Sequence, residues 1–129
     1  MTGGRLAARP GTGRHAEELA VALLEKAGLR IVARNWRRPE GELDLIADDA
    51  GTCVFVEVRS RTGAEHGDPL ESITARKRAR VIRAARLYLE AEPTVAAAYR
   101  FDVVGVTFPG DGGDPVIVHL PNAFDLSGA

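Results

Sequence analysis

Apolar residues recur at the spacing of an α-helix in two stretches of the chain, about residues 14–27 and about residues 74–91. Gly28 follows the first stretch and Pro93 follows the second, and both residue types are typical of positions just beyond a helix end. Ahead of the second helix, Asp68, Pro69 and Glu71 form a helix-start signal that predicts a short separate turn.

Five other stretches carry the β-branched, aromatic or alternating apolar residues that are typical of strands. They cover residues 29–35, 42–47, 52–59, 99–107 and 115–120. The resulting order, α-β-β-β-α-β-β, predicts an α/β protein in which helices flank one mixed sheet, with the last strand at an edge. We expect a single domain over residues 14–122, preceded by a disordered N-terminal arm (1–13) and followed by a C-terminal tail (123–129).

Acidic residues interrupt the apolar pattern of the second and third strands. Neighbouring side chains of a strand point to opposite faces, and the turn signal at residues 48–51 makes these two strands antiparallel neighbours. Asp44 and Glu57 are therefore expected to converge at one end of the hairpin. The residues expected on their face are Glu42, Ile46, Cys53, Phe55 and Arg59, and those expected on the opposite face are Leu43, Leu45, Ala47, Val54, Val56 and Val58.

Glu57 lies inside the most apolar, strand-like run of the chain, where a solitary carboxylate is costly to bury. One solution is a divalent cation, Mg²⁺ or Mn²⁺, held by Asp44 and Glu57 together, because hard oxygen ligands suit these ions. The simpler alternative is that Glu57 pairs with Arg59 or a neighbouring arginine, and that Asp44 does likewise. The metal site is favoured because the two acids lie on paired strands and an acidic helix precedes them.

The composition restricts the class of protein. The chain has 129 residues, 45% of them apolar and 27% charged, as in an ordinary globular domain. No stretch approaches the ~18 consecutive apolar residues of a membrane helix, so no membrane association is expected. The single cysteine, Cys53, excludes an intramolecular disulfide framework and a cysteine-based zinc site, and a cytoplasmic location is expected.

The net charge of -1 conceals an uneven distribution, because residues 75–86 hold six basic residues and no acidic one. A basic helix face predicts contacts with the phosphates of a nucleic acid, although a solvated helix surface is the alternative. Trp36 can stack on a base or pack in the core, and the second is commoner. The candidate nucleic-acid-binding residues are Arg76, Lys77, Arg78, Arg80 and Arg83.

Several motifs together resemble the YraN (UPF0102) family of small bacterial proteins, within the PD-(D/E)xK restriction-endonuclease-like superfamily. The resemblance covers roughly residues 14–107. The matching stretches are Ala16-Glu17-Glu18-Leu19-Ala20, Gly28-Leu29-Arg30-Ile31, Asn35-Trp36-Arg37, Gly41-Glu42-Leu43-Asp44-Leu45-Ile46, Val54-Phe55-Val56-Glu57-Val58-Arg59, Ile73-Thr74-x-Arg76-Lys77 and Arg100-Phe101-Asp102-Val103-Val104.

The resemblance implies a role for four residues. Asp44 would be the central metal-binding aspartate and Glu57 the second acid of the motif. Glu17 would be a helix carboxylate that completes the metal site, although an acid in the first turn of a helix is favourable on its own. Arg59 stands where the motif has lysine. An arginine can stabilise charge but does not lose its proton, so it cannot act as a base.

The activity implied by the resemblance is Mg²⁺-dependent hydrolysis of phosphodiester bonds in DNA, with branched or damaged DNA among the candidate substrates. A resolvase-like reaction on paired strands would need a homodimer. The alternatives are a non-catalytic nucleic-acid-binding protein that keeps the nuclease fold, and an accessory protein that binds a protein partner.

Overall fold

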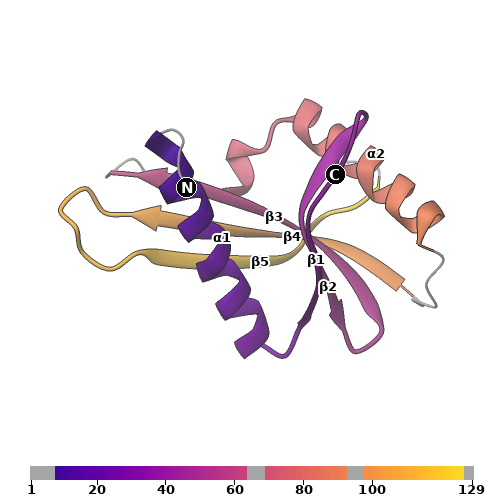
Figure 1. Ribbon diagram of the computed structural model, residues 1–129, viewed down its shortest axis with the longest axis horizontal. Coiled ribbons are helices and arrows are strands. Elements are labelled where there is room, and N and C mark those ends of the chain that lie inside the picture. Colours follow the sequence, from indigo (N-terminus) through magenta and orange to yellow (C-terminus); the bar gives the residue numbers. More distant parts are fainter. Residues whose placement is uncertain (1–7, 64–68, 93–97, 127–129) are drawn as a thin grey trace.

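The computed structural model describes residues 8–63, 69–92 and 98–126. Within these ranges the predicted order of elements is confirmed, and so is the α/β fold class with helices flanking one mixed sheet (Figure 1). Neither described α-helix is long and apolar enough to cross a lipid bilayer. The elements are α1 (Ala8–Lys26), β1 (Arg30–Arg38), β2 (Gly41–Asp49), β3 (Thr52–Thr62), the 3₁₀ turn η1 (Pro69–Ser72), α2 (Ala75–Ala91), β4 (Ala98–Phe108) and β5 (Val116–Phe124).

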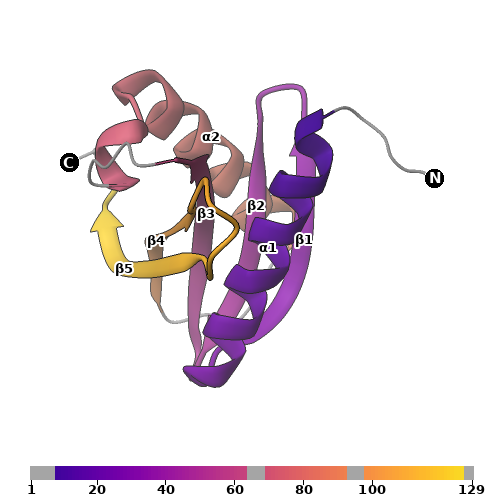
Figure 2. The same ribbon diagram turned by 90° about the vertical axis from the view of Figure 1, so that its left-hand side faces the viewer.

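The strands form one mixed sheet in the order β1-β2-β3-β4-β5. β3 and β4 pair in parallel, and the chain between them passes through η1 and α2. The other three neighbouring pairs are antiparallel, and β5 lies at an edge as predicted. The two α-helices lie on opposite sides of this sheet (Figure 2).

The core consists of two apolar layers, one on each face of the sheet. Residues of β3 alternate between them: Phe55 packs in the layer that contains α2, and Val54 and Val56 pack in the layer that contains α1. β3 is thus buried on both faces, which explains why its sequence is an almost continuous apolar run.

The folded part of the chain begins earlier and ends later in the sequence than predicted. The first helix begins at Ala8 instead of Arg14. Pro10 is tolerated because it falls in the first turn, where backbone N–H groups need no helical acceptor. Residues 8–13 of the predicted arm are therefore helical, and residues 1–7 lie outside the described ranges. At the other end, β5 continues to Phe124, which is buried, so the core extends beyond the predicted boundary at 122.

The predicted side-chain alternation of β2 is wrong at one position. Leu43 packs in the α2 layer, whereas Leu45 packs in the α1 layer. The break lies at Asp44, beside Asn35 of β1, whose φ angle of 51° is left-handed. Asn35 lies between the paired positions Arg34–Leu45 and Trp36–Leu43. Because a left-handed residue rotates the strand locally, the pattern of alternating faces changes there in both strands.

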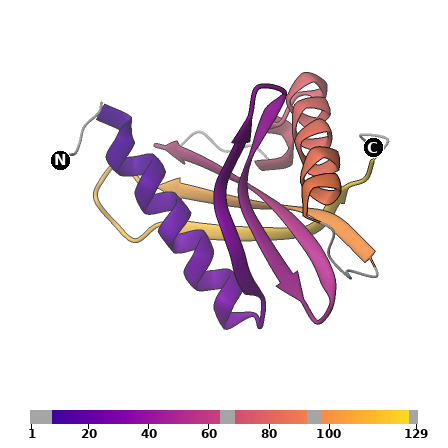
Figure 3. The ribbon, with the colours of Figure 1, turned by 45° about the vertical axis from the view of Figure 1, so that its right-hand side comes forward.

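Two glycines allow η1 and α2 to approach the sheet closely. A Cβ atom on Gly105 of β4 would lie 2.4 Å from Cγ of Pro69, and one on Gly41 would lie 2.6 Å from the carbonyl oxygen of Arg80. Either side chain would displace its neighbour. In Figure 3, α2 consequently stands beside the turn between β1 and β2.

A polar cluster surrounds the buried carboxylate of Asp102 in β4. Asp102 is 0% exposed and accepts hydrogen bonds from Arg100 Nε (3.0 Å) and the backbone N–H of Asn122 (2.9 Å), and it lies 2.8 Å from His119 Nε2. Arg100 also donates to Asp49 of β2 over 2.9 Å. The cluster joins β2, β4 and β5, and it satisfies a carboxylate that would be costly to bury alone.

Candidate functional site

The two predicted metal-binding acids lie where β2 and β3 diverge. The register of these strands ends at the pair Leu45–Val56, and Asp44 and Glu57 are the next residues on each strand. In place of a further backbone pair, the N–H of Val58 donates to Oδ2 of Asp44 over 2.9 Å. The side chain of Asp44 therefore bridges the opening between the strands, and Glu57 lies on the strand across from it.

Burial and mutual repulsion shape the electrostatics of these acids. Burial, together with the charge of Asp44, raises the pKa of Glu57 to about 8, although Arg59 and Lys77 oppose the shift. Burial also raises the pKa of Asp44, with contributions from the charges of Glu42 and Glu17, and the N–H of Val58 opposes it. The two carboxylates thus share a site in which holding two negative charges is unfavourable without a cation.

In the part of the chain that the structure describes, Glu57 forms no direct ion pair with an arginine, although the charge of Arg59 acts on it. Arg59 instead donates from Nε to Oγ of Ser72 over 3.1 Å, and Ser72 in turn donates to the carbonyl oxygen of Pro69 over 2.7 Å. Across the described ranges, the carboxylates of Asp44 and Glu57 form no ion pair within 4.0 Å, and Glu57 accepts no side-chain hydrogen bond. A partly buried carboxylate without a partner is a ready ligand for a cation.

Glu17 and Glu42 surround this pair, each held by a neighbour. Glu17 of α1 accepts a hydrogen bond from Nδ2 of Asn35 over 3.2 Å, and its charge acts on Asp44. Glu42 forms an ion pair with Nε of Arg37 over 2.9 Å, so it acts as a salt-bridge partner here.

The donor set suits a metal ion that needs few protein ligands. In the part of the chain that the structure describes, no three His, Cys, Asp or Glu side chains are grouped closely enough to hold one ion together. The arrangement therefore offers the pair Asp44 and Glu57, and the metal role of Glu17 stays a prediction. Mg²⁺ is commonly bound by one or two carboxylates and completes its shell with water and phosphate oxygens, so the pair fits it.

A small cavity of about 60 Å³ lies next to Glu57, lined by acidic and basic side chains. Glu57 and Glu42 come from the sheet, and Lys77, Arg80 and Val81 come from α2. The N-cap residue Thr74, which accepts from the N–H of Lys77 over 3.1 Å, fixes the start of this helix. Two of the predicted phosphate-binding side chains, Lys77 and Arg80, thus line the same cavity as Glu57.

The other candidate basic residues are divided between two environments. Arg76 and Arg83 are exposed on α2. Arg78 instead donates to the carbonyl oxygen of Ile73 over 3.2 Å, and its guanidinium lies 5.8 Å from the ring centre of Phe124. Arg78 is thus engaged with the start of its own helix and with the end of β5.

Trp36 packs against the core, which is the commoner of the two alternatives, core packing and stacking on a base. Its ring packs edge-on against Tyr88 at 5.4 Å between ring centres and contacts the apolar layer below α2. The guanidinium of Arg38 covers it at 4.2 Å. These contacts make Trp36 a packing residue.

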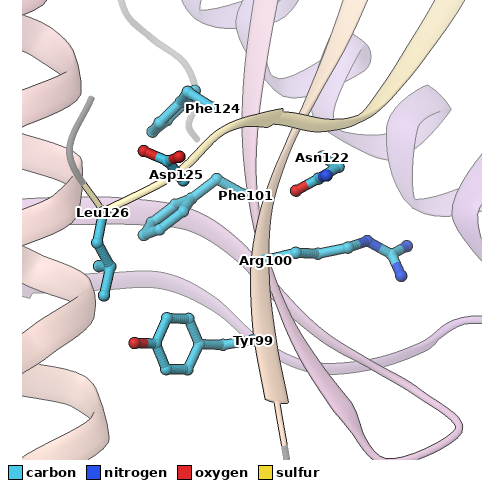
Figure 4. A pocket seen from close by; sticks show the side chains of 7 residues that line it. All are labelled: Tyr99, Arg100, Phe101, Asn122, Phe124, Asp125 and Leu126. Carbon is cyan, nitrogen blue, oxygen red and sulfur yellow. The ribbon is translucent and has the colours of Figure 1, made fainter. Parts of the chain in front are cut away.

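A separate cavity of about 320 Å³ lies around the start of β4 and the end of β5 (Figure 4). Tyr99, Phe101 and Leu126 project to one side of these strands, and Arg100 and Asn122 project to the other. Its lining includes none of the predicted site residues. We assign no role to it.

The raised pKa values predict a pH dependence of stability in metal-free protein. An acid whose pKa is higher in the folded state stabilises the protein at low pH, and this contribution is lost as pH rises toward the folded value. The free energy of unfolding is therefore expected to fall between about pH 4.5 and about pH 8, the range that the shift of Glu57 spans. Urea denaturation across this range, in the presence of EDTA, measures the effect.

Glu57→Gln removes the principal titrating group and should flatten this pH profile. The matched control is Glu71→Gln, because Glu71 is exposed on η1. A Glu57→Gln profile as steep as that of the wild type would show that Glu57 does not titrate in this range.

The fold and the site together define a small α/β protein with one mixed five-stranded sheet and two partly buried carboxylates where neighbouring strands diverge. The chain belongs to the UPF0102 family. The model of the "Uncharacterised protein family UPF0102" matches residues 16–106, which confirms the family that the motifs indicated.

Similar proteins occur in distant bacteria. A UPF0102 protein of Nocardia farcinica is 48% identical over 120 residues, covering 93% of this chain and 94% of the relative. One from Pseudomonas aeruginosa is 48% identical over 114 residues, covering 88% of this chain and 91% of the relative. Among solved structures, SfsA of Pyrococcus furiosus in complex with Ca²⁺ is similar with a TM-score of 0.39 and 19% identity, over 85% of this chain and 62% of that chain.

Sequence reasoning gave no role to Asn35, although it belongs to one of the matching motifs. The available signal was the residue type itself. Asparagine is one of the few residues that tolerate a left-handed backbone, and here it interrupts a strand beside the acidic site.

Proposed function

We propose that this protein is a Mg²⁺- or Mn²⁺-dependent phosphodiester hydrolase that acts on DNA. The observation that carries the proposal is the partly buried Glu57 carboxylate, which has no ion-pair partner among the described residues. It lies on the strand across from Asp44 and lines a cavity with Lys77 and Arg80. A bound metal ion would lower the pKa of its water and neutralise charge on the phosphate.

The residues of the chain divide the remaining tasks. Asp44 and Glu57 would hold the metal ion. Lys77 and Arg80 would bind a phosphate group of the substrate, because these side chains of α2 line the same cavity as Glu57. Arg59 is fixed by Ser72 and supplies a permanent positive charge near Glu57, but it cannot remove a proton.

The proposed substrate is DNA recognised by its backbone. Basic side chains that contact phosphate give binding that is sensitive to salt and insensitive to sequence. Since no base sequence would be read, the substrates to compare differ in shape, and branched or damaged DNA is the first to assay. A resolvase-like reaction would require two copies of the site and hence a homodimer, which light scattering of the DNA complex would detect.

The direct test is cleavage of labelled duplex and branched DNA by purified protein. Cleavage should require Mg²⁺ or Mn²⁺, stop in EDTA and be lost in Glu57→Gln, while Glu71→Gln behaves as the wild type. Cleavage that persists in EDTA or in Glu57→Gln would contradict the proposal and indicate a contaminating nuclease.

A second candidate is a nucleic-acid-binding protein without catalysis, and arginine at the lysine position of the motif favours it. In that case the protein would bind branched DNA without cutting it. Asp44→Asn would then leave the affinity for DNA unchanged in the presence of Mg²⁺.

Both candidates predict that α2 carries the DNA-binding surface. Arg76→Glu combined with Arg80→Glu is expected to weaken DNA binding by about 10- to 100-fold at moderate salt, since two phosphate contacts are replaced by repulsion. Fluorescence anisotropy at several salt concentrations measures the loss. The matched control, Arg14→Glu with Lys26→Glu, makes the same change in net charge at exposed positions of α1. Equal losses in the two variants would show that only total charge matters.

A further inference from the structure

Asn35 combines two unusual features at one position. It lies within β1, yet its φ angle is 51°, in the left-handed region that residues other than glycine rarely adopt. The paired positions on either side of it, Arg34–Leu45 and Trp36–Leu43, place it beside Asp44. Strained backbone of this kind is concentrated at functional sites, where the surrounding structure maintains it.

The side chain of Asn35 points to a second acid of the site. Its Nδ2 atom donates to Oε1 of Glu17 over 3.2 Å, and the negative charge of Glu17 acts on Asp44. Two like charges repel, so Glu17, on the surface of α1, would be more stable turned toward solvent. The amide of Asn35 supplies the hydrogen bond that holds it in place.

Docking of the helix does not depend on this contact. The neighbouring residue Arg34 forms an ion pair with Glu18 over 2.7 Å, joining the same helix to the same strand. The apolar residues Ala20 and Leu24 also pack α1 against the sheet. The hydrogen bond between Asn35 and Glu17 is therefore not needed to hold α1 against the sheet.

We infer that Asn35 is a positioning residue of the metal site: its left-handed backbone sets the direction of Asp44 between β1 and β3, and its amide holds Glu17 beside Asp44. The inference rests on the proposed function, because it assigns a role toward the metal ion. Partners that orient the surroundings of a metal commonly change its affinity by about 10- to 100-fold when they are removed.

Variants of Asn35 separate the two contributions. Asn35→Gly keeps the left-handed backbone and removes the amide, whereas Asn35→Ala disfavours the backbone as well. Isothermal titration with Mn²⁺ should show an affinity about tenfold weaker for Asn35→Gly and weaker still for Asn35→Ala. Arg34→Ala is the control, since it removes the neighbouring contact between α1 and β1, and its affinity should equal that of the wild type.

The path through Glu17 is tested by a double-mutant cycle. If the amide acts through Glu17, then Glu17→Ala combined with Asn35→Gly should bind Mn²⁺ as weakly as Glu17→Ala alone. Wild-type affinity in Asn35→Gly, or an equal loss in Arg34→Ala, would overturn the inference while the metal site stands. Absence of Mn²⁺ binding by the wild type would overturn the proposed function and the inference together.

Discussion

Asp44→Asn is expected to weaken Mn²⁺ binding by more than about 100-fold, beyond the loss typical of residues that only orient a ligand. The amide oxygen can still accept the hydrogen bond from the N–H of Val58, so the strands should remain joined at this point. What is lost is one of the two carboxylates that would hold the metal ion. Isothermal titration, repeated at several pH values, measures the change in affinity.

The same substitution should leave the metal-free protein at least as stable as the wild type near pH 8. Asp44 raises the pKa of Glu57, and removing its charge relieves that repulsion. Asp111→Asn is the matched control, because Asp111 is exposed and its Oδ1 also accepts a backbone N–H, that of Gly113, over 2.9 Å. Wild-type affinity for Mn²⁺ in Asp44→Asn would remove the basis of the proposed hydrolase.

Asp102→Ala is expected to lower the free energy of unfolding by about 3–5 kcal/mol, the usual cost of removing one partner from a buried charged group. Asp102 is 0% exposed and contacts Arg100, His119 and the N–H of Asn122. Its loss would leave a guanidinium and an imidazole without their buried acceptor. Denaturation in guanidinium chloride measures the change.

Two companion variants keep this prediction measurable. Asp102→Asn retains an acceptor for Asn122 and should cost less, so it is the variant to use if Asp102→Ala does not fold. Asp49→Ala removes a second carboxylate that pairs with Arg100, and because the side chain of Asp49 is 36% exposed, this loss should cost only about 0–1 kcal/mol. A loss in Asp102→Ala no larger than that in Asp49→Ala would show that burial does not strengthen the cluster.

Features set by short stretches of sequence were predictable. Thr74 marks the start of α2, and the apolar run of β3 marks a strand buried on both faces. The position of Asp44 and Glu57 at the same end of two neighbouring strands followed from the turn that joins those strands. Each of these inferences needs only local preferences and the geometry of a hairpin.

Features that depend on distant contacts were not predictable. The side on which Leu43 packs depends on the left-handed Asn35, and that conformation is maintained by neighbours on β2 and α1. The cluster around Asp102 draws its members from three strands, so no spacing in the sequence reveals it. The position of α2 on the sheet also decides which of its basic side chains meets Glu57. Lys77 lines the cavity with Glu57, whereas Arg78 donates to the carbonyl oxygen of Ile73.

The single parallel pair in the sheet has a consequence for folding kinetics. β1, β2 and β3 form a meander with short connections. Because short loops cost little chain entropy to close, the contacts among these strands are expected to form early. Pairing of β3 with β4 must wait for a much longer loop to close. Asp44 and Glu57 both belong to the meander, whereas Lys77 arrives with the crossover. The two acids are therefore expected to come together before Lys77 reaches them during folding.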